Sequence, residues 1–289
     1  MKVLRTALAI TLLLALVVLA GPERLRATFV ASDPGGLALA ALGYGALVVL
    51  KTERWRQVVA LQGLAIARRE ALRAYGLGML LAAVTPGRVG QHVRAVALTR
   101  RGATFEQALL GTVVDSLLDA LVFVALLPVA AAWFGLSLGR SRGLALTAAA
   151  LGAGAALAAL LLLWRRFRPA AIAALALGRK ALGWPLAMTV LATALYFGIL
   201  AIAAAAVGLR VGGVAIALAT VAAALVETAP VTVAGIGTRE ASLMALLGPL
   251  GAGLAAIVAF TMVVRALHIG AGALAWAAGR EGEGSTARV

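Results

Sequence analysis

The sequence predicts an all-α membrane protein, a polytopic helical bundle with about six full spans and two oppositely directed re-entrant helical hairpins. Hydrophobic residues make up 63% of the 289 residues and charged residues only 13%. Soluble domains carry about 25% charged residues, so lipid must cover much of this surface. Several apolar runs have the length of a spanning helix, and Pro and Gly interrupt two others at mid-length.

The N-terminal part is predicted to contain two spans and one interfacial helix. The apolar run at residues 6–21 is interpreted as a retained first span. A cleaved signal peptide is the alternative, because Val18-Leu19-Ala20 resembles a cleavage site. A second run covers residues 35–50. Residues 51–70 have basic ends around an apolar middle, which is typical of a helix lying in the headgroup layer.

Two later segments contain helices that are too short to cross a bilayer. Residues 71–104 hold about 15 fairly apolar residues, then Thr85-Pro86-Gly87, then a weaker helix. Neither half spans ~30 Å at 1.5 Å per residue. Residues 213–248 show the same organisation around Pro230. Each segment is predicted to form a re-entrant hairpin.

Four further spans complete the predicted bundle. They are expected near residues 105–133, 143–164, 185–207 and 252–277. A single transmembrane domain then covers residues 1–278. The polar tail at residues 279–289 is predicted to be disordered and cytoplasmic.

The distribution of charge predicts orientation and partners. With the N-terminus inside, nineteen Lys and Arg residues fall on the cytoplasmic side and five on the opposite side. Six spans then place both termini in the cytoplasm, and the protein in the cytoplasmic (inner) membrane. The net charge is +15, but the basic residues lie between apolar runs, so no nucleic-acid partner is expected. The sequence has no cysteine, which excludes thiolate metal sites, and neither a cofactor nor a metal ion is expected.

The two halves of the chain share a pattern. "TPGRVGQHVR" and "AGIGTREASL" each place a Gly-containing turn before a polar cluster. A helix containing Val-Val-charged-x-Leu follows each of them, at residues 113–117 and 263–267. Inverted repeats whose broken helices meet near the midplane are the usual plan of secondary transporters. Chance similarity between Gly- and Ala-rich membrane segments is the alternative.

Several ionisable residues are predicted to lie deep in the membrane, where each would cost about 2.5–3.5 kcal/mol without a partner. They must pair with each other or face a watery cavity, and structural ion pairs and a polar pathway both remain open. Asp115 and Asp119 share one helical face, as do Arg265 and His268. We expect both faces to line one cavity, with Arg265 opposite Asp115. The candidate charge-coupling residues are Asp115, Asp119, Glu227 and Glu240.

The broken turns favour anion binding. A half-helix that begins at depth presents backbone N–H groups and a positive dipole end, which suits a phosphate or carboxylate. Glycines let the backbone approach a ligand closely, and arginines add charge-assisted hydrogen bonds. The candidate substrate-binding residues are Gly87, Gly90, Arg94, Gly235, Gly237, Arg239 and Arg265.

These motifs resemble the transmembrane region of lysylphosphatidylglycerol synthases and the related stand-alone flippase-like membrane proteins. Residues 86–94 are similar to the family's Pro-Gly-x-x-Gly-Glu-x-x-Arg, and residues 230–240 to its Pro-x-x-x-Gly-x-Gly-x-x-Glu. Arg265 matches a basic residue that is usual on the following helix. Gln91 stands where the pattern has Glu, and Asp115-Ser116 stands where it has Glu-Arg. The resemblance covers most of residues 50–277.

The resemblance implies a flippase that moves a phospholipid or lipid-linked headgroup through a polar midplane cavity, with membrane lipids as its partners. The sequence contains no soluble aminoacyltransferase domain and no recognised hydrolase motif, so it is not expected to be an enzyme. The residues alone leave three alternatives open. These are a small-ion or metabolite transporter, a lipid or glycosyl transferase using Asp115 and Asp119 with a metal ion, and a scaffold for a lipid-modifying enzyme.

Overall fold

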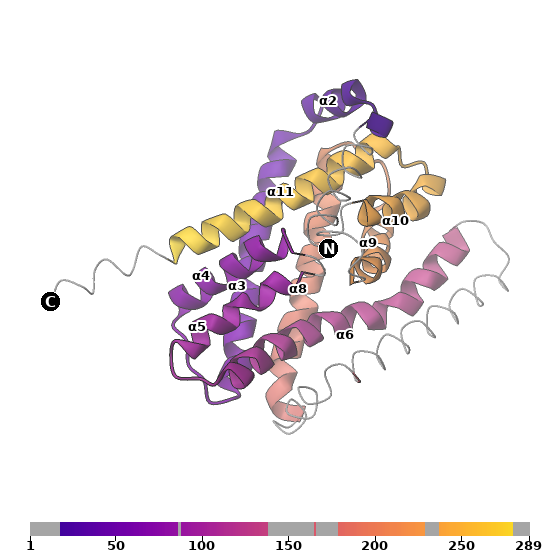
Figure 1. Cartoon of the computed structure of the whole chain (residues 1–289). Coiled ribbons are helices and arrows are strands. Elements are labelled where there is room, and N and C mark those ends of the chain that lie inside the picture. The colour runs from indigo at the N-terminus through magenta and orange to yellow at the C-terminus, as the bar shows by residue number, and fades with distance from the viewer. Residues whose placement is uncertain (1–17, 86–87, 138–164, 166–178, 229–236, 280–289) are drawn as a thin grey trace, which may run out of the picture.

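A computed structural model of the chain describes residues 18–85, 88–137, 165, 179–228 and 237–279 (Figure 1). Within these ranges all the regular elements are helices, as the composition predicts. Four of them have the length and hydropathy of a membrane span: α3 (Pro34–Ala60), α6 (Phe105–Ser137), α8 (Arg179–Ala206) and α11 (Leu254–Ala278). The predicted span at residues 143–164, most of that at 6–21 and nearly all of the predicted disordered tail lie outside the described residues.

Helix α3 contradicts the predicted interfacial helix. Asp33 caps its start, since the two carboxylate oxygens accept hydrogen bonds from the backbone N–H groups of Gly35 and Gly36, each at 2.9 Å. The helix then continues without a break to Ala60, so the prediction that it gives way to an interfacial helix at residue 51 is wrong. Arg54 and Trp55 in this last part are buried. Two of the charges that indicate a headgroup location, Lys51 and Arg54, pair with carboxylates of α6 (Phe105–Ser137).

The first predicted interruption is confirmed. Helix α4 (Arg68–Ala82) has 15 residues, and the chain resumes as η1 (Val89–Arg94), a 3₁₀ helix, and α5 (Ala95–Thr99). At 1.5 Å per residue α4 is about 22 Å long, short of a ~30 Å bilayer core. η1 folds back against α4. Gly90 makes this possible, because a Cβ there would lie 2.5 Å from the carbonyl carbon of Leu81.

The second predicted half-length helix is also present. Helix α9 (Gly213–Thr228) has 16 residues and packs against α10 (Thr238–Leu247), which leads through η2 (Gly248–Leu250) into α11. Gly237 precedes α10 with φ +87°, a backbone conformation that favours glycine. Pro86, Gly87 and residues 229–236, which include Gly235, lie outside the described residues.

The helix packing is similar in the two halves of the chain, because corresponding helices have corresponding partners. Each half runs through a long helix, a half-length helix, a break, short helical pieces and a second long helix. Helices α3 and α8, the first of each half, pack together, α4 packs along α11, and α9 packs along α6. Each half-length helix therefore packs against the second long helix of the other half. Figure 1 shows α4 running beside α11.

The apolar core occupies the helices that surround these breaks. Its fully buried members include Leu200 of α8, Ile216 of α9, and Ile257 and Phe260 of α11. The short helix α2 (Pro22–Val30) lies at one end of the bundle, against α11. Large apolar side chains such as Leu42, Val190 and Leu274 are exposed, as expected for surfaces that lipid covers.

Candidate functional site

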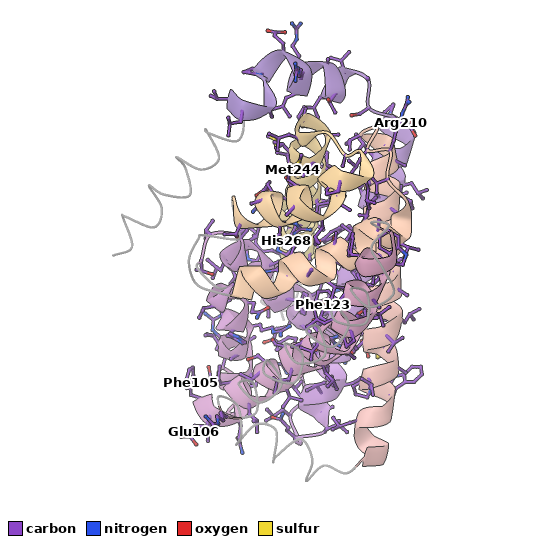
Figure 2. All side chains as sticks on the ribbon, turned by 90° about the vertical axis from the view of Figure 1, so that its right-hand side faces the viewer. Phe105, Glu106, Phe123, Arg210, Met244 and His268 are labelled. Atoms are coloured by element: carbon purple, nitrogen blue, oxygen red, sulfur yellow. The ribbon has the colours of Figure 1, made fainter. Side chains whose placement is uncertain are left out.

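Two adjoining cavities lie between the broken hairpins. The first has a volume of about 180 Å³ and the second about 150 Å³. Their shared wall consists of Tyr44, Ala82, Arg88, Tyr196, Arg239 and His268. Figure 2 shows Phe123 and His268, which both line the first cavity, at mid-height between Glu106 at one end of the bundle and Arg210 towards the other. The site therefore lies deep within the bundle.

A buried charge cluster forms one side of the site. The guanidinium of Arg54, on α3, donates from Nε to Asp115 Oδ1 at 2.8 Å and from Nη1 to Asp119 Oδ1 at 2.6 Å. Nη1 also donates to Thr189 Oγ1 of α8 at 3.1 Å. Arg54 has no exposed surface. Because an unpaired charge at this depth is costly, these bonds fix α3, α6 and α8 to one another.

Arg94 connects the first hairpin to this cluster. Its Nη2 lies 2.8 Å from Asp115 Oδ2 and donates to the backbone carbonyl of Thr112 at 3.2 Å. Its guanidinium carbon lies 5.3 Å from the ring centre of Trp55 and 4.9 Å from that of Tyr75, within the range of a cation–π contact. Its Nε is buried without a hydrogen-bond partner among the described residues. Arg94 lines the first cavity.

Lys51 and Asp119 extend the buried charge cluster to the wall of the first cavity. Lys51 Nζ donates to Asp119 Oδ2 at 3.0 Å, and both residues line the first cavity. Arg54 Nη2 also donates to this oxygen, at 3.1 Å. Both carboxylate oxygens of Asp119 therefore already accept hydrogen bonds from cationic groups. A metal ion bound by Asp115 and Asp119 would have to displace these partners.

The second hairpin contributes an ion pair of its own. Arg265 Nη2 of α11 donates to Glu240 Oε1 of α10 at 3.1 Å. Glu240 is buried, and its other oxygen accepts from the backbone N–H of Gly237 at 2.8 Å. Arg239 donates to the Tyr196 hydroxyl at 3.4 Å. Arg265 lines the second cavity and Arg239 lines both.

The predicted pairing of Arg265 with Asp115 is wrong. Each residue pairs instead with the short helix of its own half: Asp115 with Arg94 of η1, and Arg265 with Glu240 of α10. The two residues occupy corresponding positions in the Val-Val-charged-x-Leu pattern. Both halves therefore have an ion pair at the same position of the repeat. In the first half the long helix supplies the acid, and in the second half it supplies the base. Asp115 is also paired with Arg54, a second cation that the charge pattern predicts at the membrane surface.

His268 does share the cavity wall with charged residues, as its helical face predicts. Its Nδ1 lies 3.1 Å from the hydroxyl of Tyr44, and its Nε2 lies 3.3 Å from the backbone carbonyl of Met79. These contacts join α3, α4 and α11 at the boundary of the two cavities.

The structure separates the predicted site residues into three groups. Arg94, Asp119, Arg239 and Arg265 line the cavities. Asp115 and Glu240 lie behind the wall as partners of Arg94 and Arg265. Gly90 and Gly237 shape the ends of the breaks. The remaining members, Gly87, Gly235 and the side chain of Glu227, lie outside the described residues.

Sequence reasoning missed three basic residues of the site. Lys51 and Arg54 were assigned to the membrane surface, yet their spacing of three residues places both on the face of α3 that meets Asp115 and Asp119. Arg88, which is not among the predicted site residues, lines both cavities. Its left-handed backbone, with φ +57°, lies directly after the first break. The signal that would have found Lys51 and Arg54 is the opposite charge at matching spacing on α6.

The charge of the lining is strongly positive. Of the described residues that line the two cavities, Lys51, Arg88, Arg94, Arg239 and Arg265 are cationic, and Asp119 is the one carboxylate. Tyrosine hydroxyls and apolar side chains such as Leu47 and Val48 complete the walls. Cationic side chains that line a cavity attract anions, above all phosphate and carboxylate groups.

Comparison of the chain with known proteins identifies its family. No curated protein matches it. A family model, that of the lysylphosphatidylglycerol synthase TM region, matches residues 4–275, which include both hairpins and every residue that lines the two cavities. The all-α architecture and the membrane-spanning helices agree with this match. The chain is therefore a membrane protein that belongs to the lysylphosphatidylglycerol synthase TM region family.

Proposed function

We propose that this protein is a lipid flippase or transporter, not an enzyme, and that it moves a phospholipid or lipid-linked headgroup across the cytoplasmic membrane. The observation that carries the proposal is the cationic pair of cavities at mid-depth between two broken hairpins. A polar headgroup crossing a bilayer needs a polar route at the depth where lipid offers none. Family membership adds that the chain is related to proteins of lipid metabolism.

The size of the cavities fits a headgroup and excludes the acyl chains. Volumes of about 180 and 150 Å³ are each below the range of about 300–1,000 Å³ typical of sites for drug-sized ligands. The acyl chains would remain in the surrounding lipid while the headgroup passes between the halves. The apolar side chains exposed on the bundle provide that lipid-facing surface.

The proposed topology has six spans, both termini in the cytoplasm, and two re-entrant hairpins of opposite direction. Support comes from the half-length helices α4 and α9 and from packing that repeats when the halves are exchanged. Such inverted repeats allow a transporter to open alternately to the two sides around a fixed site. The carboxylates Asp115, Asp119 and Glu240 would hold the cavity cations while no substrate is bound.

A transporter of small free anions is the second candidate. It is favoured by the modest cavity volume, which also suits inorganic phosphate or a small carboxylate. The two functions share the same cationic groups and differ in whether acyl chains accompany the anion. A lipid-modifying enzyme remains a proposed partner under either function.

Reconstitution into lipid vesicles tests the proposal. Wild-type protein should accelerate the movement of acyl-labelled phospholipid between leaflets, and Arg239→Ala and Arg265→Ala should each abolish most of this acceleration. Arg210→Ala removes an exposed arginine away from the cavities and should leave the rate unchanged. Lipid movement equal to that of empty vesicles would reject the flippase, and uptake of radioactive phosphate by the same vesicles would favour the second candidate.

A further inference from the structure

The wall between the two cavities contains aromatic rings from both halves of the chain. Resting on the proposed lipid transport, we infer that Tyr44, Tyr196 and His268 form a gate in this wall, closed by the hydrogen bond between Tyr44 and His268. All three residues line both cavities. A headgroup that passes from one cavity to the other must therefore move these rings apart.

The three rings pack edge to face at the boundary of the cavities. The ring centre of Tyr44 lies 6.4 Å from that of Tyr196 and 6.1 Å from that of His268, with interplanar angles of 86° and 90°. Aromatic rings prefer such edge-to-face contacts. Tyr44 is also buried, so its ring fills space that a passing headgroup would need.

The hydrogen bonds of His268 identify the group that closes the gate. Its Nε2 lies 3.3 Å from the backbone carbonyl oxygen of Met79. A carbonyl oxygen only accepts, so Nε2 carries the proton, and in the neutral ring Nδ1 is then an acceptor. The Tyr44 hydroxyl, 3.1 Å from Nδ1, is therefore the donor of the bond that joins the two rings.

The bonds at this wall join the two halves of the chain. Tyr44 and Met79 belong to the first half, and His268 belongs to the second. By contrast, the ion pair beside each break joins residues of one half. Hydrogen bonds between neutral groups are about half as strong as those that involve ions. Movement of one half against the other therefore breaks the weaker bonds at the wall and keeps these ion pairs.

Two variants remove the bond between Tyr44 and His268 and keep the rest of the wall. Tyr44→Phe deletes the hydroxyl and keeps the ring. His268→Gln keeps an N–H near the position of Nε2, for the Met79 carbonyl, and has no acceptor at the position of Nδ1. Thr261→Val is the matched control. It deletes a buried hydroxyl of α11 that donates within its own helix, to the Val258 carbonyl at 3.0 Å, away from both cavities.

Opening of the gate is measured with the reporter Ala82→Cys, because Ala82 is buried in the shared wall and the chain has no other cysteine. The rate at which a small methanethiosulfonate modifies this thiol in detergent-purified protein follows the fraction of open gates. Tyr44→Phe and His268→Gln should each raise the rate about two- to tenfold, the change that loss of one neutral hydrogen bond produces. The double variant should match the single variants, because both remove the same bond. Thr261→Val should leave the rate unchanged.

The second arm measures lipid movement in vesicles that contain the same variants without the reporter. Acyl-labelled phospholipid should move between the leaflets faster with Tyr44→Phe and with His268→Gln than with wild type, by the same factor as the thiol reaction. Thr261→Val should move lipid at the wild-type rate.

A thiol rate that neither variant raises, an equal rise with Thr261→Val, or effects that multiply in the double variant would overturn the gate. Unchanged or slower lipid movement by the two variants, with an active wild type, would overturn it as well. If wild type moves no lipid while the thiol rates follow the expected pattern, the gate stands as the barrier between the cavities and the proposed lipid transport fails. The two arms therefore separate the two failures.

Discussion

At the scale of single residues, the site is governed by the cost of burying charge. Arg54 has no exposed surface and Asp115 is almost fully buried. Neither would be stable there alone, because desolvation of each ion costs several kcal/mol. The two residues are held by mutual hydrogen bonds and by Asp119, Arg94 and Thr189 around them. If any one of the cations is removed, the remaining cations must neutralise the carboxylate that it leaves.

The first prediction concerns Arg54. Arg54→Ala should lower the free energy of unfolding by about 3–5 kcal/mol, because it leaves Asp115 and Asp119 with fewer partners in a buried site. Arg68→Ala is the control, since Arg68 is 82% exposed and lies 3.6 Å from Glu53; it should change stability by less than about 0.5 kcal/mol. Unfolding in mixed detergent micelles, followed by circular dichroism, measures both. Equal stability of the two variants would contradict the role of Arg54.

The sequence identified several residues of this cluster and missed the pairing between them. Asp115 and Asp119 were predicted to be deep and to share a face, because spacing along one helix is readable from sequence. Their partners belong to α3 and η1: Arg54 is 61 residues from Asp115 in the sequence, and Arg94 is 21 residues from it. Such pairings depend on how the helices pack, which no local pattern specifies. Arg54 was therefore placed at the surface and Arg265 was given the wrong carboxylate.

At the scale of elements, the breaks in two helices create the site. Both half-length helices end within a few residues of the positions that the Pro and Gly residues of the sequence predict. The predicted start of an interfacial helix at residue 51 failed for a physical reason. Charge within an apolar helix indicates a membrane surface only when no buried partner exists, and here Lys51 and Arg54 have such partners.

Close approach of α4 and α11 gives a second prediction. A Cβ at Gly76 would lie 2.5 Å from the carbonyl oxygen of Gly272 and 2.6 Å from the backbone nitrogen of Trp276. Gly76→Ala should therefore destabilise the protein by about 1–3 kcal/mol, because the helices must separate. Gly198→Ala makes the same change in α8 where nothing lies within 4 Å, and helix propensity should stabilise it by up to about 1 kcal/mol. In the same unfolding assay, Gly76→Ala should be less stable than Gly198→Ala. The reverse order would contradict the close packing of α4 against α11.

At the scale of the whole molecule, corresponding helices of the two halves have corresponding packing partners. Each half-length helix packs along the second long helix of the other half, and each half holds one ion pair beside its break. This arrangement places the two breaks around one shared volume. It also means that movement of one half relative to the other would change the access to the cavities without dissolving either ion pair.

The third prediction concerns the direction of the hairpins. The chain has no cysteine, so single cysteines can be introduced directly at exposed ends of each hairpin. Cysteines at Arg69 and Arg100 should react with an impermeant maleimide only from the cytoplasmic side, and cysteines at Gly212 and Gly253 only from the opposite side. Labelling of the two ends of one hairpin from opposite sides would show a continuous crossing and would reject the re-entrant topology.

The central claim is that a water-filled, positively charged cavity lies at mid-depth between the breaks, and thiol reactivity at Thr220 tests it most directly. Thr220 lines the first cavity, whereas Thr261, also buried, lines neither. The account predicts that Thr220→Cys reacts with a small anionic methanethiosulfonate at least about ten times faster than with a cationic one, because the lining attracts anions. Thr261→Cys should react with neither reagent. An unreactive cysteine at position 220, or one that reacts faster with the cationic reagent, would contradict the account.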